Sequence, residues 1–233
     1  MENQFDRIEK MIGEGALEKL KSSRVAVFGI GGVGGACAEA LARMGIGAID
    51  LVDNDVVSPS NLNRQAVALH STIGRFKVDV MAERIMDINP ECKVSCYKIF
   101  YLPDNADSID LSCYDSVIDA IDTVAAKIEL VVRAKAAGVN IICSMGAGNR
   151  MDPTQFVVTD ISKTEIDPLA KAVRKELRSR GITDVKVVWS KELPLPSLEG
   201  VSGSEARVPA SNSFVPPTAG LILAAEAVKY LIK

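Results

Sequence analysis

The chain has 233 residues, 48% of them hydrophobic, and a formal net charge of −3 at neutral pH. This length and composition suffice for one substantial core, so we expect a single domain, and the mild negative charge argues against a protein that binds nucleic acid over its whole surface. The first twenty residues are charged and helical in period, and charges interrupt the late apolar stretch 219–232, so we expect neither a signal peptide nor a membrane partner.

Strand-like and helix-like segments alternate along the first two thirds of the chain. Strands are predicted at residues 25–28, 48–52, 93–99, 116–119 and 140–144, with helices at 33–44, 77–88 and 123–137 between them. After Gly148 we expect a strand, a helix, a strand, a loop rich in proline and serine, and a terminal helix, at 154–160, 167–180, 184–190, 192–217 and 219–232. The alternation predicts an α/β fold with a doubly wound, mostly parallel sheet and a ligand at the carboxyl ends of its strands.

A glycine-rich turn follows the first predicted strand. Gly29, Gly31 and Gly34 have G-x-G-x-x-G spacing directly after the β-branched run 25–28. Gly29 permits a tight turn, Gly31 lets the backbone approach a phosphate, and Gly34 lets the helix pack closely on the strand. The helix N-terminus adds unpaired N–H groups and a partial positive charge, so we predict a nucleotide phosphate here.

Polar residues after the second strand indicate the kind of nucleotide. Asp53 stands where an acidic group usually binds ribose hydroxyls. Arg64 and Lys77 follow it, and they could neutralise a triphosphate, Arg64 as a planar fork and Lys77 as a point charge. A nicotinamide cofactor has only a diphosphate, so the pattern favours ATP. The alternative is that both residues are ordinary surface cations.

Two aspartates lie at the carboxyl end of the strand 116–119: Asp119 is its last residue, and Asp122 follows three positions later. Helix capping alone would explain one of them. A carboxylate beside a phosphate site is also a hard oxygen ligand that suits Mg²⁺, and we assign that role to Asp122.

The chain resembles the ThiF/MoeB/HesA superfamily of ubiquitin-activating-like adenylating enzymes. The matching pieces occur in the order of the family: GIGGVG (29–34), DND (53–55), NLNRQ (61–65), GRFKV (74–78) and DAIDTVAAK (119–127). The resemblance implies a Rossmann-like sheet of the ThiF type that binds ATP and Mg²⁺, with a monovalent cation as a further candidate. The nucleotide contacts that it implies, together with our reading of the motifs, are Gly29, Gly31, Gly32, Gly34, Asp53, Asp55, Asn61, Arg64, Gln65, Lys77 and Asp122, with Asp122 as the metal ligand.

The resemblance also implies that the catalytic residues are Arg64, Lys77, Asp122 and Arg7. In the family, an arginine from the N-terminal helix of the partner subunit reaches the phosphates, and Arg7 in FDRIEKMIG is its match. We therefore expect a homodimer. Within the single domain we expect N-terminal helices at 1–22, a nucleotide-binding core at 23–150 and a substrate-side extension at 151–233, in which a crossover loop spans about 191–217.

The segment 146–182 looks like the branch of tRNA threonylcarbamoyladenosine dehydratases. That branch activates the threonyl carboxylate of a modified adenosine in tRNA, after which ring closure expels AMP. The alternative is a ThiF/MoeB-like enzyme that adenylates the Gly-Gly tail of a sulfur-carrier protein. A third hypothesis, of a different class, is a non-catalytic nucleotide-binding protein or an NAD-dependent redox protein. No residue clearly presents itself as the base for ring closure; Asp119 or Asp122 could contribute, and the sequence does not decide this. The sulfur-transfer partners, if any, are not indicated either.

The cysteines bear on these alternatives. The five, at 37, 92, 96, 113 and 143, form no C-x-x-C pair, which gives no support to a zinc knuckle and fits a reducing cytoplasm. No cysteine falls in 185–216, where a thioester relay would need a thiol, and Cys143 in its apolar run is interpreted as packing.

Charge supports an RNA substrate. Residues 163–191 contain eight Lys and Arg against four acidic residues, although the whole chain is acidic. On the predicted helix, one stripe of four basic residues opposes an apolar side formed by Leu169, Val173 and Leu177. The stripe comprises Lys171, Arg174, Lys175 and Arg178. We predict that it holds the tRNA backbone, the alternative being a solvated helix face.

Overall fold

The computed structural model describes residues 3–196 and 209–233. Within these residues, seven strands form one sheet in the order β3-β2-β1-β4-β5-β7-β6, and all neighbours are parallel except β6 and β7. The strands are β1 (Arg24–Phe28), β2 (Ala48–Val52), β3 (Lys93–Tyr97), β4 (Ser116–Asp119), β5 (Asn140–Ser144), β6 (Phe156–Asp160) and β7 (Lys186–Ser190). The predicted doubly wound, mostly parallel sheet is confirmed.

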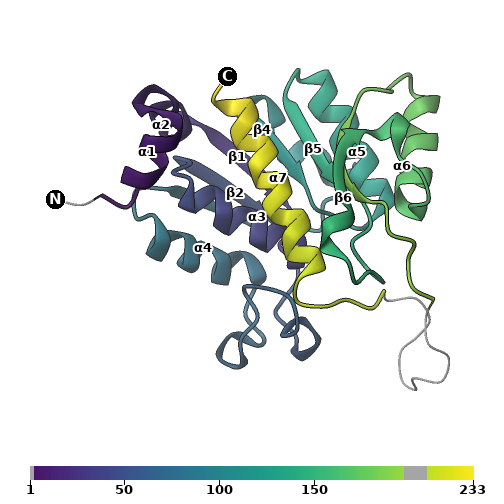
Figure 1. Cartoon of the computed structure of the whole chain (residues 1–233), viewed down its shortest axis with the longest axis horizontal. Coiled ribbons are helices and arrows are strands. Elements are labelled where there is room, and N and C mark those ends of the chain that lie inside the picture. Colours follow the sequence, from purple (N-terminus) through teal and green to yellow (C-terminus); the bar gives the residue numbers. More distant parts are fainter. Residues whose placement is uncertain (1–2, 197–208) are drawn as a thin grey trace.

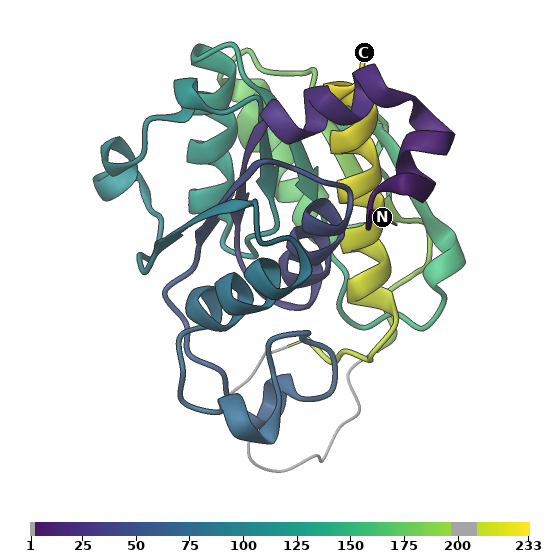
Figure 2. The same ribbon diagram turned by 90° about the vertical axis from the view of Figure 1, so that its left-hand side faces the viewer.

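Helices cover both faces of this sheet (Figure 1 and Figure 2). They are α1 (Asp6–Ile12), α2 (Glu14–Ser22), α3 (Gly32–Arg43), α4 (Lys77–Ile88), α5 (Val124–Ala136), α6 (Pro168–Ser179) and α7 (Val215–Leu231). Alternate side chains of β1 enter two separate cores, Val25 and Val27 with α3, α4 and α7, and Ala26 and Phe28 with α5 and α6. No helix in the described part of the chain is long and apolar enough to span a bilayer.

Helix α7 packs closely against α3. A Cβ atom at Gly220 would lie 2.1 Å from the carbonyl oxygen of Val33, so this crossing requires glycine. The helix begins at Val215, within the predicted loop, because the side-chain Oδ1 of Asn212 accepts the Val215 N–H at 2.8 Å. The prolines after Val215 suit a first helical turn, which does not use the N–H that proline lacks. The helix therefore begins two residues before the predicted end of the crossover loop at about residue 217, and the part of that loop at 197–208 lies outside the described residues.

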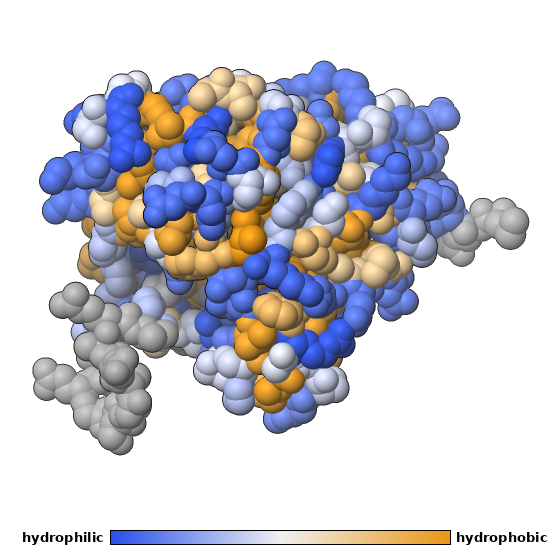
Figure 3. Space-filling model, turned by 180° about the vertical axis from the view of Figure 1, so that it is seen from behind, coloured by the Kyte–Doolittle hydropathy of each residue, from blue (hydrophilic) through white to orange (hydrophobic). Residues whose placement is uncertain are grey.

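A lobe of residues 53–76 connects β2 to α4 and projects beyond the carboxyl edge of the sheet (Figure 1). Figure 3 shows apolar side chains on its surface, and Val56, Leu69, Ile73 and Phe76 are each more than a third exposed there. The Thr72 hydroxyl ties the lobe together by donating to the Val67 carbonyl at 2.7 Å. The lobe contains the segment 61–65, so its local fold fixes the polar residues predicted to bind the nucleotide.

Candidate active site

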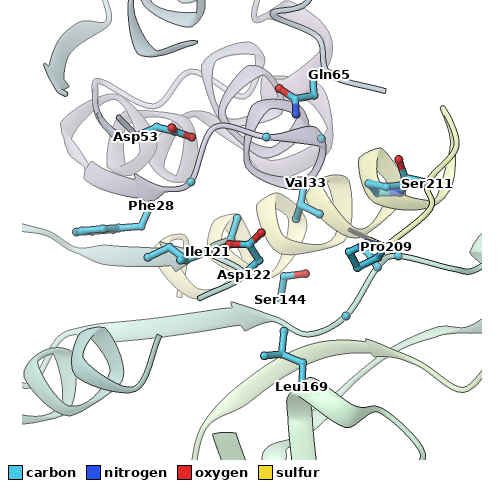
Figure 4. Close-up of a pocket in the computed structure, with 18 of the residues that line it drawn as sticks. Phe28, Val33, Asp53, Gln65, Ile121, Asp122, Ser144, Leu169, Pro209 and Ser211 are labelled. Carbon is cyan, nitrogen blue, oxygen red and sulfur yellow. The ribbon is translucent and has the colours of Figure 1, made fainter. Parts of the chain in front are cut away.

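A cavity of about 600 Å³ opens at the carboxyl edge of the sheet (Figure 4). The glycine turn after β1, the lobe after β2, the turn after β4 and the loop after β5 all reach it, as do the start of α6, Pro194, Pro209 and Ser211. The predicted site residues that line it are Gly29, Gly31, Gly32, Asp53, Asp55, Asn61, Arg64, Gln65, Lys77 and Asp122. Gly34 and Arg7 do not line it.

The glycine turn has the stereochemistry predicted from its spacing. Gly29 has φ of +86°, a left-handed conformation that favours glycine. A Cβ atom at Gly34 would lie 1.7 Å from the Gly29 carbonyl oxygen, so Gly34 acts through close packing and not through the cavity. At Gly31 the nearest atom to such a Cβ is 3.8 Å away, and no side chain caps the start of α3 at Gly32. The first N–H groups of α3 are therefore available to an anion.

Asp53 lies at the end of β2, beside the glycine turn. One carboxylate oxygen accepts the Ile30 N–H at 2.6 Å, and the other accepts the Asp55 N–H at 2.8 Å. Burial is the largest influence on the carboxyl and raises its pKa. Each oxygen keeps a further lone pair, so Asp53 can hold the turn and still accept a ribose hydroxyl.

The two predicted cations have different surroundings. The Lys77 side chain is 7% exposed, and its ammonium donates to the Asp55 carboxylate at 2.7 Å. Arg64 forms no ion pair in the described part of the chain, and its guanidinium donates to the Ser60 carbonyl and the Asn63 side chain. Burial lowers the pKa of Arg64, although a guanidinium remains protonated in proteins. A phosphate would compete with Asp55 for Lys77, whereas Arg64 would gain its first anionic partner.

Two amides from the segment 61–65 also line the cavity. Asn61 shapes the lobe, since its Oδ1 accepts the Ser58 N–H at 3.1 Å. Gln65 is 7% exposed, and its buried Oε1 has no hydrogen-bond partner among the described residues. An unsatisfied buried amide is costly, so the Gln65 side chain fits a role in ligand binding.

The two aspartates after β4 have separate environments. Asp122 is exposed and lies beside the cavity (Figure 4), and from the described residues its carboxylate accepts only a long bond of 3.4 Å, donated by Thr123. Asp119 is fully buried and pairs with the ammonium of Lys127 at 2.6 Å. Of the two aspartates that could contribute to ring closure, only Asp122 lines the cavity.

The donor set around Asp122 fits a magnesium ion that shares its ligands with a nucleotide. Among the described residues no three His, Cys, Asp or Glu side chains gather as a metal cluster. Magnesium is usually held by one or two carboxylates together with phosphates and water, and Asp122 beside the phosphate turn matches that pattern.

The far wall of the cavity contains residues that sequence reasoning missed. Arg150 is 3% exposed, and its guanidinium donates to the Gly146 carbonyl, the Glu192 carbonyl and the Asp167 carboxylate. Asp167 also accepts the Gly146 N–H at 3.0 Å and caps α6 through the Ala170 N–H at 2.9 Å. One signal was available, because Asp-Pro at the start of a predicted helix is typical of a capped N-terminus.

Asn149 joins two parts of the chain that lie on either side of residues 197–208 in the sequence. Its backbone carbonyl accepts the Leu195 N–H, and its side chain accepts the Ala210 N–H, both at 2.7 Å. Its φ of +55° is the one positive value at a described residue other than glycine. Cys143 behaves as predicted, since it is fully buried and burial raises its pKa. None of the described residues that line the cavity is a cysteine.

The fold and the cavity together define a nucleotide-binding α/β protein with cations placed for a polyphosphate. The sequence pattern of the ThiF family matches residues 5–233, and the chain belongs to this family. It is 48% identical over 244 residues to the tRNA threonylcarbamoyladenosine dehydratase of Bacillus subtilis, which covers 100% of this chain and 96% of the relative. It is 43% identical over 205 residues to the enzyme of the same name from Escherichia coli, over 84% of this chain and 76% of the relative.

A solved structure gives the same result. The structure of E. coli tRNA N6-threonylcarbamoyladenosine dehydratase, TcdA, in complex with AMP matches with a TM-score of 0.89 and 39% identity, over 98% of this chain and 93% of the other. A structure of the same enzyme in complex with ATP matches with a TM-score of 0.89 and 38% identity, over the same shares of the two chains. The resemblance inferred from the sequence motifs is confirmed, for the superfamily and for the dehydratase branch.

Proposed function

We propose that this chain is an ATP-dependent tRNA threonylcarbamoyladenosine dehydratase. The observation that carries the proposal is its similarity to such a dehydratase over the whole chain, at 48% identity. The cavity supports it, because the residues predicted to bind ATP and the far wall that contains Arg150 and Asp167 line one continuous space. The carrier-protein alternative has less support, since the similarity to an adenylyltransferase and sulfurtransferase of Candida glabrata covers 56% of this chain at 33% identity.

The first chemical step is in-line attack of the threonyl carboxylate on the α-phosphorus of ATP, with pyrophosphate leaving. Arg64 and Lys77 balance the charge of the phosphates, and the first N–H groups of α3 hold the phosphate chain. Asp122 would hold magnesium, which supplies further charge neutralisation when bound. The protein positions the two reactants and stabilises the negative charge on the phosphates, as is usual in transfer to or from phosphorus.

The second step closes the ring. The carbamoyl nitrogen attacks the activated carbonyl carbon, a carbon–nitrogen bond forms, and the carbon–oxygen bond to AMP breaks as the nitrogen loses a proton. This step needs no thiol, in agreement with a described cavity wall free of cysteine. Of Asp119 and Asp122, only Asp122 lines the cavity, so we assign to it any carboxylate assistance in proton removal.

We also propose that the active unit is a homodimer in which Arg7 enters the cavity of the partner. Helix α1 has no buried residues, and Arg7 is exposed on it. No residue of α1 lines the cavity of its own chain. The proposal therefore requires a second copy, and location in the cytoplasm and a monovalent cation site remain predictions.

The tRNA contact that we propose starts from the cavity and follows α6. Asp167, Pro168 and Leu169 line the cavity, and Pro168 shares a helix face with Lys171 and Lys175. Arg178 continues that face, and all three cations are exposed. Arg174 does not belong to it, because its guanidinium donates to the carbonyl and the hydroxyl of Thr164. The predicted four-residue stripe is thus a three-residue stripe that leads to the cavity.

The test is ATP–pyrophosphate exchange with three additions made separately: tRNA carrying threonylcarbamoyladenosine, the same tRNA without the modification, and a sulfur-carrier protein ending in Gly-Gly. We expect exchange only with the modified tRNA, followed by AMP and the cyclic nucleoside in equal amounts. Exchange with the carrier protein alone would overturn the proposal and favour the alternative.

A further inference from the structure

A lysine and an aspartate are buried together directly behind the turn that carries Asp122. Lys127 and Asp119 are both 0% exposed, and their Nζ and Oδ2 atoms lie 2.6 Å apart. The same ammonium donates to the Ser144 carbonyl at 2.9 Å. The other oxygen of Asp119 accepts the Ile121 N–H at 3.1 Å.

These bonds join the ends of two strands that lead to the cavity with helix α5. Asp119 ends β4, Ser144 ends β5, and Lys127 lies in the first turns of α5. The residues that follow β4, Ala120 to Asp122, line the cavity, and so does the loop that begins at Ser144. The pair therefore fixes the turn of Asp122 relative to the next strand.

Stability alone is a weak reason for such a pair. Taking two charges out of water is costly, and well-packed apolar residues of similar volume often replace a buried pair without loss. An apolar pair could neither donate to the Ser144 carbonyl nor accept the Ile121 N–H. The pair thus supplies a defined geometry at the cavity that apolar packing could not.

We propose that Lys127 and Asp119 are positioning residues that hold Asp122 where it can bind a divalent cation together with the phosphates of ATP. This inference rests on the role proposed above for Asp122. It adds that the site for the cation depends on two side chains that contact neither nucleotide nor metal. Such supporting contacts typically change metal affinity by about 10- to 100-fold.

The chain offers a matched control in a second buried network of the sheet, away from the cavity. Asp50 in β2 is 1% exposed and accepts bonds from the Tyr114 hydroxyl and the Arg24 guanidinium, both at 2.7 Å. This network is also a buried carboxylate with a cationic partner, but it involves no residue that lines the active-site cavity. Tyr114→Phe removes one of its bonds and should leave the cavity unchanged.

The experiment titrates Mn²⁺, as a probe for the divalent cation, into the protein saturated with α,β-methylene-ATP. The variants are Lys127→Met, Asp119→Asn with Lys127→Met, Asp122→Asn as the positive reference, and Tyr114→Phe. We expect the first two to weaken Mn²⁺ binding by about tenfold or more, in the direction of Asp122→Asn. AMP affinity without metal should not change, and Tyr114→Phe should keep the parent Mn²⁺ affinity.

The double variant leaves no unpaired buried charge, so it keeps the test valid if Lys127→Met does not fold. Parent-like Mn²⁺ affinity in either folded Lys127 variant would overturn the proposal, as would a reduction in Tyr114→Phe of equal size. An unchanged Mn²⁺ affinity in Asp122→Asn would instead remove the underlying role of Asp122. The titration contains no RNA, so its outcome is independent of whether the parent protein cyclises the modified nucleoside.

Discussion

The two walls of the cavity satisfy their polar groups in opposite ways. On the nucleotide side, Arg64 has no anionic partner in the described part of the chain, and the Oε1 of Gln65 has no hydrogen bond there. On the far side, Arg150 and Asp167 are almost fully buried and bonded to each other and to the surrounding backbone. The polar groups of the first wall are placed to find partners in a bound ligand, whereas those of the second wall already have partners within the protein. Replacement of a residue should therefore affect catalysis on the first wall and stability on the second.

The largest effect is expected on the nucleotide side. Lys77→Ala, Arg64→Ala and Asp122→Ala should each lower the rate of AMP formation by about 10²- to 10³-fold, because each removes a charged group that stabilises the transition state. The stability of the fold should change little at Arg64 and Asp122, which are not buried.

The measurement is AMP release from modified tRNA, with urea unfolding of each variant beside it. Arg84→Ala is the matched control, since Arg84 pairs with Glu39 on the surface and lies outside the cavity. Turnover at the parent rate in all three variants would show that the site is assigned wrongly.

On the far wall the effect should be on stability. Arg150→Met leaves the Asp167 carboxylate buried without its cation, and breaking a buried pair in this way costs about 3–5 kcal/mol. Urea unfolding should show that decrease, while AMP affinity stays at the parent value because Arg150 lies on the other wall. A stable Arg150→Met protein with impaired AMP binding would break the distinction between the two walls.

The sequence predicted the first wall far better than the second. Gly29, Arg64 and Lys77 stand in short motifs whose spacing follows from contact with one ligand, so local patterns reveal them. Arg150 and Asp167 are 17 positions apart, and Lys127 meets Asp119 from the next helix. Such pairs form only when distant segments pack together, and that packing could not be predicted from local sequence patterns. Even so, Lys127 is 4 and 7 positions before the buried Val131 and Ala134, a spacing that marks it as part of the buried face of α5.

The terminal helix shows the same limit. Its body was predicted from the apolar run. Its start at Val215, however, follows from the bonds that the Phe214 and Val215 N–H groups donate to the Asn212 side chain, and the prolines there were interpreted as a loop. Likewise, Arg174 has the spacing of the basic stripe, and only its contact with Thr164 removes it from that surface.

A smaller effect is expected for the residue that we place between two copies of the chain. A mixture of Arg7→Ala and Lys77→Ala proteins, each inactive alone, should regain about a quarter of the parent activity, since half of the dimers are mixed and each has one intact site. The measurement is AMP formation after subunit exchange, with Lys10→Ala in place of Arg7→Ala as the control. A fully active monomer, or no recovery after proven exchange, would contradict this prediction.

The smallest effect concerns the approach of RNA to the far wall. Lys171→Glu with Lys175→Glu should weaken tRNA binding and lower the slope of log affinity against log salt by somewhat less than one for each phosphate that the variant no longer neutralises. The weakening should be similar for all tRNA sequences, because backbone contacts position the RNA and do not read it. ATP affinity without tRNA should stay unchanged, since neither residue lines the cavity. The control with the same change of charge is Lys19→Glu with Lys93→Glu, two exposed residues in α2 and at the start of β3 that lie outside the cavity. If both double variants bind tRNA equally at low salt, the basic residues of α6 face solvent and do not contact the RNA, which must then reach the cavity by another route.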